Sequence, residues 1–200
     1  MSAFLVLKNE HRVIEQVLNC LEKIAEEGVK GDKLNGEAAG QALEFFKYFA
    51  DRCHHGKEED HLFPMMEANG FPREGGPTGV MLYEHDLGRK HIQGMRTQLA
   101  AASAGNTEAV LQFAGHARDY VRLLRDHINK EDHCLFAMAE RALSPDKQAE
   151  LYAAFERVET EHMGEGTHER WLAVANALAE QYDVPRATET ANHSGCCGHH

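Results

Sequence analysis

Apolar side chains recur along most of the chain at spacings of three and four residues, which is the pattern of one buried face of an α-helix. The first segment shows it at Val6, Val13, Val17, Leu21 and Ile24. Clusters of glycine, asparagine and proline interrupt the pattern and mark the ends of the segments. The pattern therefore predicts four long helices, which cover about residues 3–27, 37–68, 78–104 and 107–143.

A fifth helical segment is predicted after the fourth helix. Ser144 can cap its first turn, and Pro145 suits the first helical position because that position needs no backbone N–H. We expect the segment to be interrupted near Gly164 and Gly166 and to end before Pro185. It should cover one flank of the other helices.

The fold class follows from these segments. No alternating run of valine, isoleucine and threonine is long enough to suggest a sheet. Four long helices with mostly short connections favour an all-α, up-and-down antiparallel four-helix bundle, with the fifth segment as an additional C-terminal element. We expect one domain over residues 1–185. Residues 186–200 are polar and carry no helical stripe, so they are predicted to form a flexible tail.

Composition narrows the range of partners. The 200 residues include 32 acidic and 21 basic side chains, which gives a formal net charge of -11. This charge repels phosphate backbones and anionic lipid headgroups, so binding to nucleic acid or to a membrane surface is not expected. No apolar run approaches the roughly 20 residues of a membrane-spanning helix. No secretory signal is visible, which favours a cytoplasmic location.

The cysteines do not indicate a disulfide framework. There are five, an odd number, and Cys20, Cys53 and Cys134 lie within helical patterns, as reduced thiols do. Cys196 and Cys197 lie in the tail beside three histidines. These side chains could capture a soft metal, but their spacing fits no closed zinc site.

The most informative feature is a ten-residue match between residues 54–63 and 127–136, with the shared pattern H-x-x-K-E-[ED]-x-x-L-F. Residues four apart lie on one helix face, so each copy directs an imidazole and a carboxylate toward one point. These donors suit iron, manganese or zinc, and carboxylates from two helices can bind two metals in a bundle core. The pattern predicts two half-sites, His54 with Glu58 and His127 with Glu131. The alternative is that both are ordinary pairs on a helix surface.

The other two helices each offer a histidine to such a site. His11 lies midway in the first helix, and His85 lies early in the third. Taken alone, either would be read as a surface or hydrogen-bonded core histidine. Because two half-sites already require further ligands, we predict that both histidines contribute.

This order of residues resembles the hemerythrin-like, or HHE cation-binding, family over about residues 5–142. The resemblance implies a four-helix bundle that holds a non-heme di-iron centre, with oxo- or hydroxo-bridged irons, and binds oxygen or a related small ligand. The family pattern is one histidine on the first helix, His-x-x-x-Glu on the second, a histidine on the third and His-x-x-x-Glu on the fourth. The metal ligands that it implies are His11, His54, Glu58, His85, His127 and Glu131.

The chain departs from the oxygen-carrying hemerythrins on the third helix. Those proteins have a second histidine four residues after the first, where this chain has Arg89. The centre is therefore expected to have a vacancy, a solvent ligand or a replacement ligand. The candidates for a replacement are Glu15, His61, Glu161 and His162. An open position favours reactive chemistry or sensing over reversible transport.

Several neighbouring residues are not expected to bind the metals directly. His55 and Glu59 repeat the four-residue spacing but are rotated by about 100° from the first pair, so they are expected behind the ligands or in solvent. Lys57 and Lys130 are expected to offset nearby carboxylate charge or to extend outward. Surface positions or hydrogen bonds are expected for His116, His133 and His168.

Three classes of function remain open on the sequence alone. The first is a di-iron protein that binds oxygen, peroxide or nitric oxide for sensing, storage or detoxification. The second is an enzyme that consumes peroxide or acts as an oxidase at the same irons. The third is a structural module with one zinc or an empty core. The sequence does not indicate the redox partner.

Overall fold

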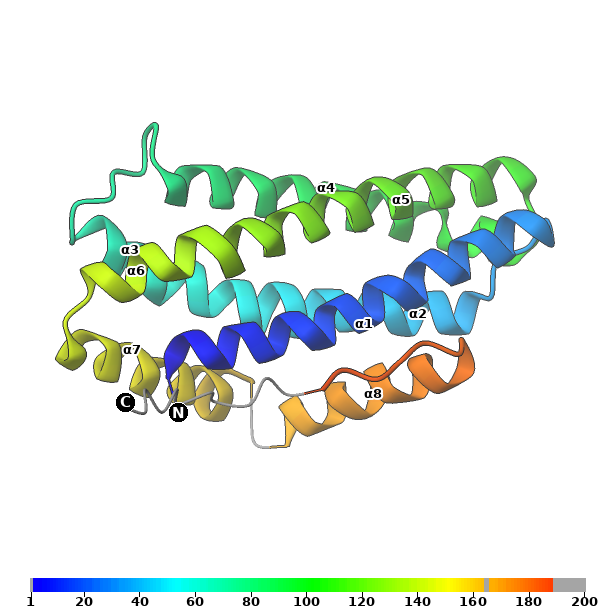
Figure 1. Cartoon of the computed structure of the whole chain (residues 1–200). Coiled ribbons are helices and arrows are strands. Elements are labelled where there is room, and N and C mark those ends of the chain that lie inside the picture. Colours follow the sequence, from blue (N-terminus) through cyan, green and yellow to red (C-terminus); the bar gives the residue numbers. More distant parts are fainter. Residues whose placement is uncertain (1, 164–165, 189–200) are drawn as a thin grey trace, which may run out of the picture.

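The computed structural model describes residues 2–163 and 166–188, without the side chains of residues 162 and 163. The described residues form helices and loops, with no strand among them. The long helices lie side by side in alternating directions (Figure 1). The prediction of an all-α bundle with an additional C-terminal helical element is confirmed.

The four predicted helices are present, and two of them are built from several consecutive pieces. The first is α1 and the third is α4. The second and fourth are divided where α-helical hydrogen bonding gives way to π-helical bonding, in the segments labelled η. The bounds are α1 Ala3–Lys30; α2 Gly36–Phe45, η1 Phe46–His55, η2 Glu58–Leu62 and α3 Phe63–Glu67; α4 Pro77–Ser103; and α5 Thr107–Lys130, η3 Glu131–Leu135 and α6 Phe136–Ala142.

Side-chain caps explain where several helices begin. The Ser2 hydroxyl accepts from the Leu5 N–H at 3.1 Å, at the start of α1. Asn35 and Asn106 cap α2 and α5 in the same way. A cap of this kind satisfies a backbone N–H that has no partner inside the helix.

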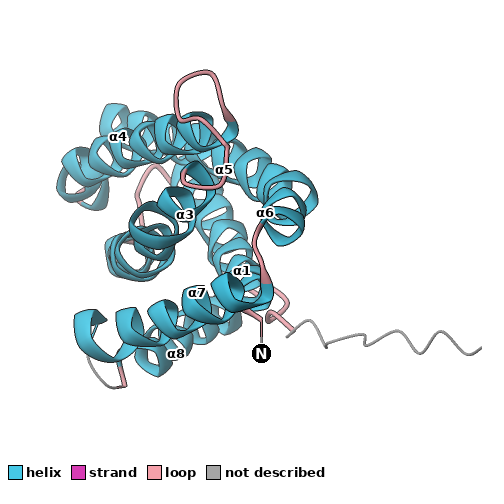
Figure 2. Cartoon of the chain, turned by 90° about the vertical axis from the view of Figure 1, so that its left-hand side faces the viewer, coloured by secondary structure: helices cyan, strands magenta, loops and turns pink. Residues whose placement is uncertain are grey.

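The C-terminal segment consists of α7 Pro145–Arg157, η4 Val158–Met163 and α8 Thr167–Gln181. It covers one flank of the bundle beside α1 (Figure 2), as predicted. After α8 the chain still packs against α1, because the backbone N–H of Ala187 donates to Gln16 Oε1 at 2.6 Å. The predicted tail at 186–200 therefore starts in contact with the bundle. Its remainder, including Cys196 and Cys197, lies outside the described residues.

The core consists of two apolar clusters with buried polar residues between them. The larger includes Ile14, Phe46 and Leu124. The smaller includes Leu7 and Phe63 and also contains the Leu-Phe pairs that end both copies of the repeat. Along α1, Glu10 and His11 lie between Leu7 and Ile14 and are themselves buried. The polar site thus occupies the middle of a well-packed apolar interior.

In the part of the chain that the structure describes, no helix has both the length and the apolar character needed to cross a membrane. Cys20 and Cys53 are buried free thiols, and Cys134 is an exposed one. The cytoplasmic location stays a prediction.

Candidate metal centre

Two groups of potential metal ligands meet in the interior of the bundle. The six residues predicted from the sequence all belong to them, together with His55. Within each group the donor atoms lie within 4.8 Å of one another, and every side chain is buried. The first group is His11, His54, Glu58 and Glu131, and the second is His55, Glu58, His85 and His127.

The two glutamates lie between the groups. Glu58 directs Oε1 toward His54 Nε2 at 3.6 Å and Oε2 toward His85 Nε2 at 3.5 Å. Glu131 directs Oε2 toward His11 Nε2 and Oε1 toward His127 Nε2, both at 3.2 Å. Each carboxylate therefore presents one oxygen to each group, which is the arrangement needed to hold two neighbouring cations.

Several of these donor atoms have no hydrogen-bond partner among the described residues. They are His11 Nε2 and both carboxylate oxygens of Glu58 and of Glu131. Leaving a buried polar group unpaired costs about 1–3 kcal/mol, and more when the group is charged. Because the unpaired atoms converge and are imidazole nitrogens and carboxylate oxygens, the donor set fits iron, manganese or zinc.

The pKa values of Glu58 and Glu131 are shifted in opposite directions. Burial and the charge of Glu131 raise the pKa of Glu58 well above its usual range. Burial also acts to raise the pKa of Glu131, but the neighbouring His127 and His11 outweigh it and hold that pKa well below its usual range. Without a cation, a proton on Glu58 relieves the repulsion between the two groups.

Four of the five histidines of the centre are oriented from behind by a carboxylate. The Nδ1 atoms of four of them lie 2.6–2.9 Å from a carboxylate oxygen, and the pairs are His11 with Asp132, His54 with Glu10, His85 with Glu59, and His127 with Glu84. His55 Nδ1 lies 3.5 Å from Asp51. Such contacts leave Nε2 free to bind a metal and fix the orientation of the ring.

These carboxylates connect the four helices in a closed ring. Glu10 on α1 holds a histidine of η1, Glu59 on η2 holds one of α4, Glu84 on α4 holds one of α5, and Asp132 on η3 holds one of α1. Each of the four lies next in sequence to a predicted ligand. Glu10, Glu84 and Asp132 were not predicted to support the ligands, and this adjacency is the signal that could have found them. Asp51, which approaches His55 from four residues earlier on the same helix, has no such neighbour.

Basic side chains in turn hold the carboxylates. Arg12 contacts Asp132, Lys57 contacts Glu10, and Lys130 contacts Glu84. Arg89 Nη2 lies 2.7 Å from both Asp51 and Glu59. Lys57 and Lys130 therefore offset nearby carboxylate charge, which is one of the two roles predicted for them from the sequence.

The position expected for His55 is wrong, whereas the position expected for Glu59 is correct. His55 is 5% exposed and stacks on His85, with ring centroids 3.8 Å apart. The expectation assumed an α-helix, but Phe46–His55 is π-helical. A π-helix has more residues per turn than an α-helix, so successive residues are rotated by less than 100° about the helix axis. Neighbouring side chains therefore point in more similar directions. Both His54 and His55 consequently face the interior.

The structure also changes the interpretation of Arg89. Its guanidinium contacts Asp51, Glu59 and Asp86, and it supports the carboxylates behind His55 and His85. The additional imidazole of the second group comes from η1 instead. None of the four suggested replacements belongs to either group within the described residues: Glu15 pairs with Arg12, His61 is half-buried outside the groups, Glu161 is exposed, and the side chain of His162 is not described.

His116 and His133 have the environments that were expected. His133 is exposed and its ring lies 3.0 Å from the Asn129 carbonyl. His116 is half-buried beside His91, with their Nδ1 atoms 3.4 Å apart. His168 does not match its expectation: the ring is half-buried, packs against Phe49 and lines a cavity, and its Nδ1 is buried with no hydrogen-bond partner among the described residues.

The family described as Hemerythrin HHE cation binding domain matches residues 3–139. The chain belongs to this family. An uncharacterized protein of Mycobacterium tuberculosis is 24% identical over 163 residues, which cover 80% of this chain and 62% of the relative. A protein of Mycobacterium bovis shows the same identity and coverage. The chain thus spans about three fifths of the length of these mycobacterial relatives.

The iron-sulfur cluster repair protein YtfE of Musicola paradisiaca is 35% identical over 89 residues, which cover 42% of this chain and 39% of that protein. No solved structure matches the chain significantly. The family match agrees with the geometry of the two groups in pointing to a cation-binding domain.

Proposed function

We propose that this hemerythrin-like domain holds two iron ions and uses them to bind oxygen, peroxide or nitric oxide. The observation that carries the proposal is the placement of Glu58 and Glu131, each with one oxygen toward either histidine group. A module with a single metal would leave one of the two groups without a function.

The residues divide naturally between two cations. His11 and His54 would hold the first, and His55, His85 and His127 would hold the second. Glu58 and Glu131 would serve both. When bound, the irons supply redox chemistry and a Lewis-acidic position for a small ligand. The protein's part is to keep the imidazole rings oriented and to neutralise the cations with two buried carboxylates.

A cavity of about 180 Å³ supports the access of a small ligand to the second group. Its lining includes His55 and His85, together with Gly88 and Tyr120. A side-chain Cβ at Gly88 would lie 3.4 Å from the Tyr120 ring, so glycine keeps this part of the cavity open. A cavity of this volume has room for a diatomic molecule or peroxide.

The relative from Musicola paradisiaca supports iron as the metal, and the net charge of -11 supports a small ligand rather than nucleic acid or a membrane as the partner. The same site would serve a protein that binds the ligand without turnover and an enzyme that consumes peroxide. Catalytic evolution of oxygen after peroxide is added to the iron-loaded protein would distinguish the enzyme from the binding protein.

The direct test is anaerobic iron loading followed by separate exposure to oxygen, peroxide and nitric oxide. We expect a ligand-dependent absorption band for at least one of them in the wild-type protein. The band should be absent from Glu131→Ala and present in His133→Ala, in which an exposed histidine outside the centre is removed. If no ligand changes the spectrum of the loaded wild-type protein, the proposed function is wrong.

A further inference from the structure

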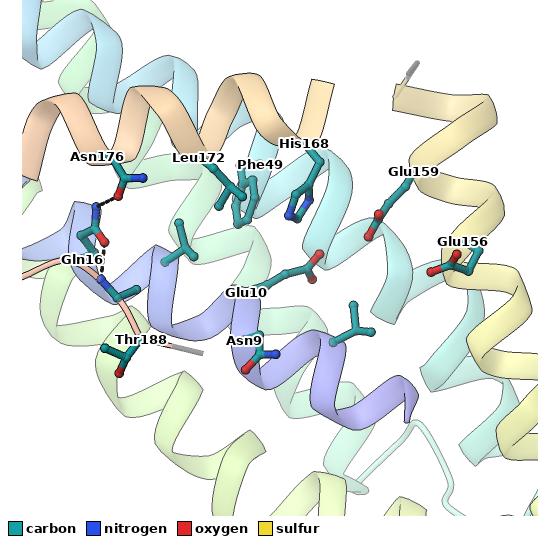
Figure 3. Close-up of a pocket in the computed structure, with 13 residues that line it drawn as sticks. Asn9, Glu10, Gln16, Phe49, Glu156, Glu159, His168, Leu172, Asn176 and Thr188 are labelled. Atoms are coloured by element: carbon teal, nitrogen blue, oxygen red, sulfur yellow. Dashed lines mark hydrogen bonds between the residues drawn. The ribbon is translucent and has the colours of Figure 1, made fainter. Parts of the chain in front are cut away.

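A third group of donors lies outside the two groups of the candidate centre. Glu10, Glu159 and His168 approach one another at a cavity of about 330 Å³ between α1, η1, η4 and α8 (Figure 3). Glu159 belongs to η4, beyond the residues that the family match covers. The C-terminal segment therefore reaches the immediate surroundings of the metal centre.

A buried cation already lies at this group. Lys57 is fully buried, and its ammonium contacts the carboxylates of both Glu10 and Glu159. A buried ammonium requires such partners because its desolvation is costly. Since Lys57 neutralises both carboxylates, we assign no metal to this group.

These contacts form a continuous connection to the candidate centre. Glu159 contacts Lys57, Lys57 contacts Glu10 Oε1, and Glu10 Oε2 lies 2.9 Å from His54 Nδ1. The other ring nitrogen of His54 faces Glu58. Glu10 is 3% exposed, whereas the Glu159 side chain is 29% exposed and lines the cavity. A charge at the edge of a solvent-accessible cavity is thus linked to the back of a predicted metal ligand.

We propose that Glu159 is a positioning residue of the metal centre, which acts on His54 through Lys57 and Glu10. The inference rests on the proposed function, because it takes His54 as a metal ligand. With Glu159 present, Lys57 divides its charge between two carboxylates, and Glu10 remains a strong acceptor for the Nδ1 proton of His54. A strong acceptor at Nδ1 makes the other nitrogen a better donor to a metal.

Neutralising Glu159 should weaken this effect in a defined direction. Lys57 would then act mainly on Glu10 and withdraw electron density from the contact with His54. His54 would become a poorer donor, so that the reduced, less positive state of the irons is favoured. We expect Glu159→Gln to raise the midpoint potential of the iron-loaded protein and to weaken iron binding by less than the roughly tenfold loss typical of a residue directly behind a metal ligand, such as Glu10.

The matched control is Glu156→Gln. Glu156 is an exposed glutamate that lines the same cavity, and the change removes the same charge without removing a contact to Lys57. Spectroelectrochemistry of the full-length, iron-loaded variants should show a clear upward shift for Glu159→Gln and a much smaller one for Glu156→Gln. Equal shifts, or no shift for Glu159→Gln, would overturn the proposal.

Two further measurements separate this role from general destabilisation and from failure of the di-iron proposal. In a Glu10→Gln background the connection is already broken, so Glu159→Gln should have no additional effect on the potential. In metal-free protein, Glu159→Gln should move the nitrogen-15 resonance of His54 Nδ1, and Glu156→Gln should not. If that resonance is unmoved, the connection does not exist, whether or not iron binds. If it moves while iron fails to bind, the di-iron proposal fails instead.

Discussion

The imidazole ring of His55 lies flat on that of His85, with centroids 3.8 Å apart and ring planes inclined by 13°. One histidine comes from η1 and the other from α4. At the position where oxygen-carrying hemerythrins have a second histidine on the third helix, α4 carries Arg89, and the additional imidazole of this group is that of His55 on η1. Arg89 contacts Asp51 and Glu59, the carboxylates behind the His55 and His85 rings.

His55→Phe should weaken the binding of one of the two irons, because the variant keeps an aromatic ring against His85 but has no nitrogen donor. Titration of anaerobic protein with ferrous iron, followed by analysis of bound metal, should show one site close to wild-type affinity and one weakened at least tenfold. His133→Ala is the control. Two unchanged sites in His55→Phe would place His55 outside the coordination of the metals.

Arg89→His should loosen iron rather than tighten it. From the sequence alone, a histidine at this position would complete the spacing on the third helix and improve binding. In the structure, the substitution removes the cation that holds Glu59 and Asp51. We expect roughly tenfold weaker binding, comparable with other losses behind metal ligands. Arg122→His, an exposed position paired with Asp119, serves as the comparison, and tighter binding in Arg89→His would contradict this interpretation.

Glu58→Ala and Glu131→Ala should each abolish binding of two irons, since each removes a carboxylate that faces both groups. Glu59→Ala should have a smaller effect, of about 10- to 100-fold in affinity, because Glu59 only orients His85. Metal analysis after gel filtration distinguishes these outcomes. Equal iron loss in Glu58→Ala and Glu59→Ala would mean that Glu58 does not serve both metals.

Gly88→Leu should slow the arrival of small ligands by filling the cavity that His55 and His85 line. Gly115→Leu is a matched control, because nothing lies within 4 Å of a Cβ at that position. Both changes replace a helical glycine, which adds about 0.5–1 kcal/mol of helix propensity. At the buried Gly88 the contact of the new side chain with Tyr120 acts against that gain. Stopped-flow mixing of the iron-loaded variants with azide should show slower association in Gly88→Leu alone, at unchanged iron content. Equal rates would show that ligands enter elsewhere.

Removal of metal should lower the thermal stability, since a cation that binds only the folded state stabilises it by about 2.7 kcal/mol at a free concentration of one hundred times its dissociation constant. Chelation should therefore lower the melting temperature of the wild-type protein. Glu131→Ala should melt at one temperature with or without chelator. A wild-type melting temperature that does not respond to chelation would indicate that no metal is held by the buried groups.

Much of this arrangement could be predicted from the sequence, because helical periodicity fixes which residues share a face. His54 with Glu58 and His127 with Glu131 were found from spacing and repetition, and the structure brings them together with His11 and His85. His55 was misplaced because an apolar stripe does not distinguish an α-helix from a π-helix over ten residues. Glu10, Glu84 and Asp132 were missed because each acts on a histidine of a different helix, and sequence spacing describes only one helix at a time.

The central claim is that Glu58 and Glu131 serve two irons at once. Anomalous diffraction at the iron absorption edge, from crystals of anaerobically loaded protein, tests it most directly. We predict two iron peaks per chain, one beside His11 and His54 and the other beside His55, His85 and His127, with both glutamates in contact with both peaks. A single peak, or two peaks without a shared glutamate, would contradict the account.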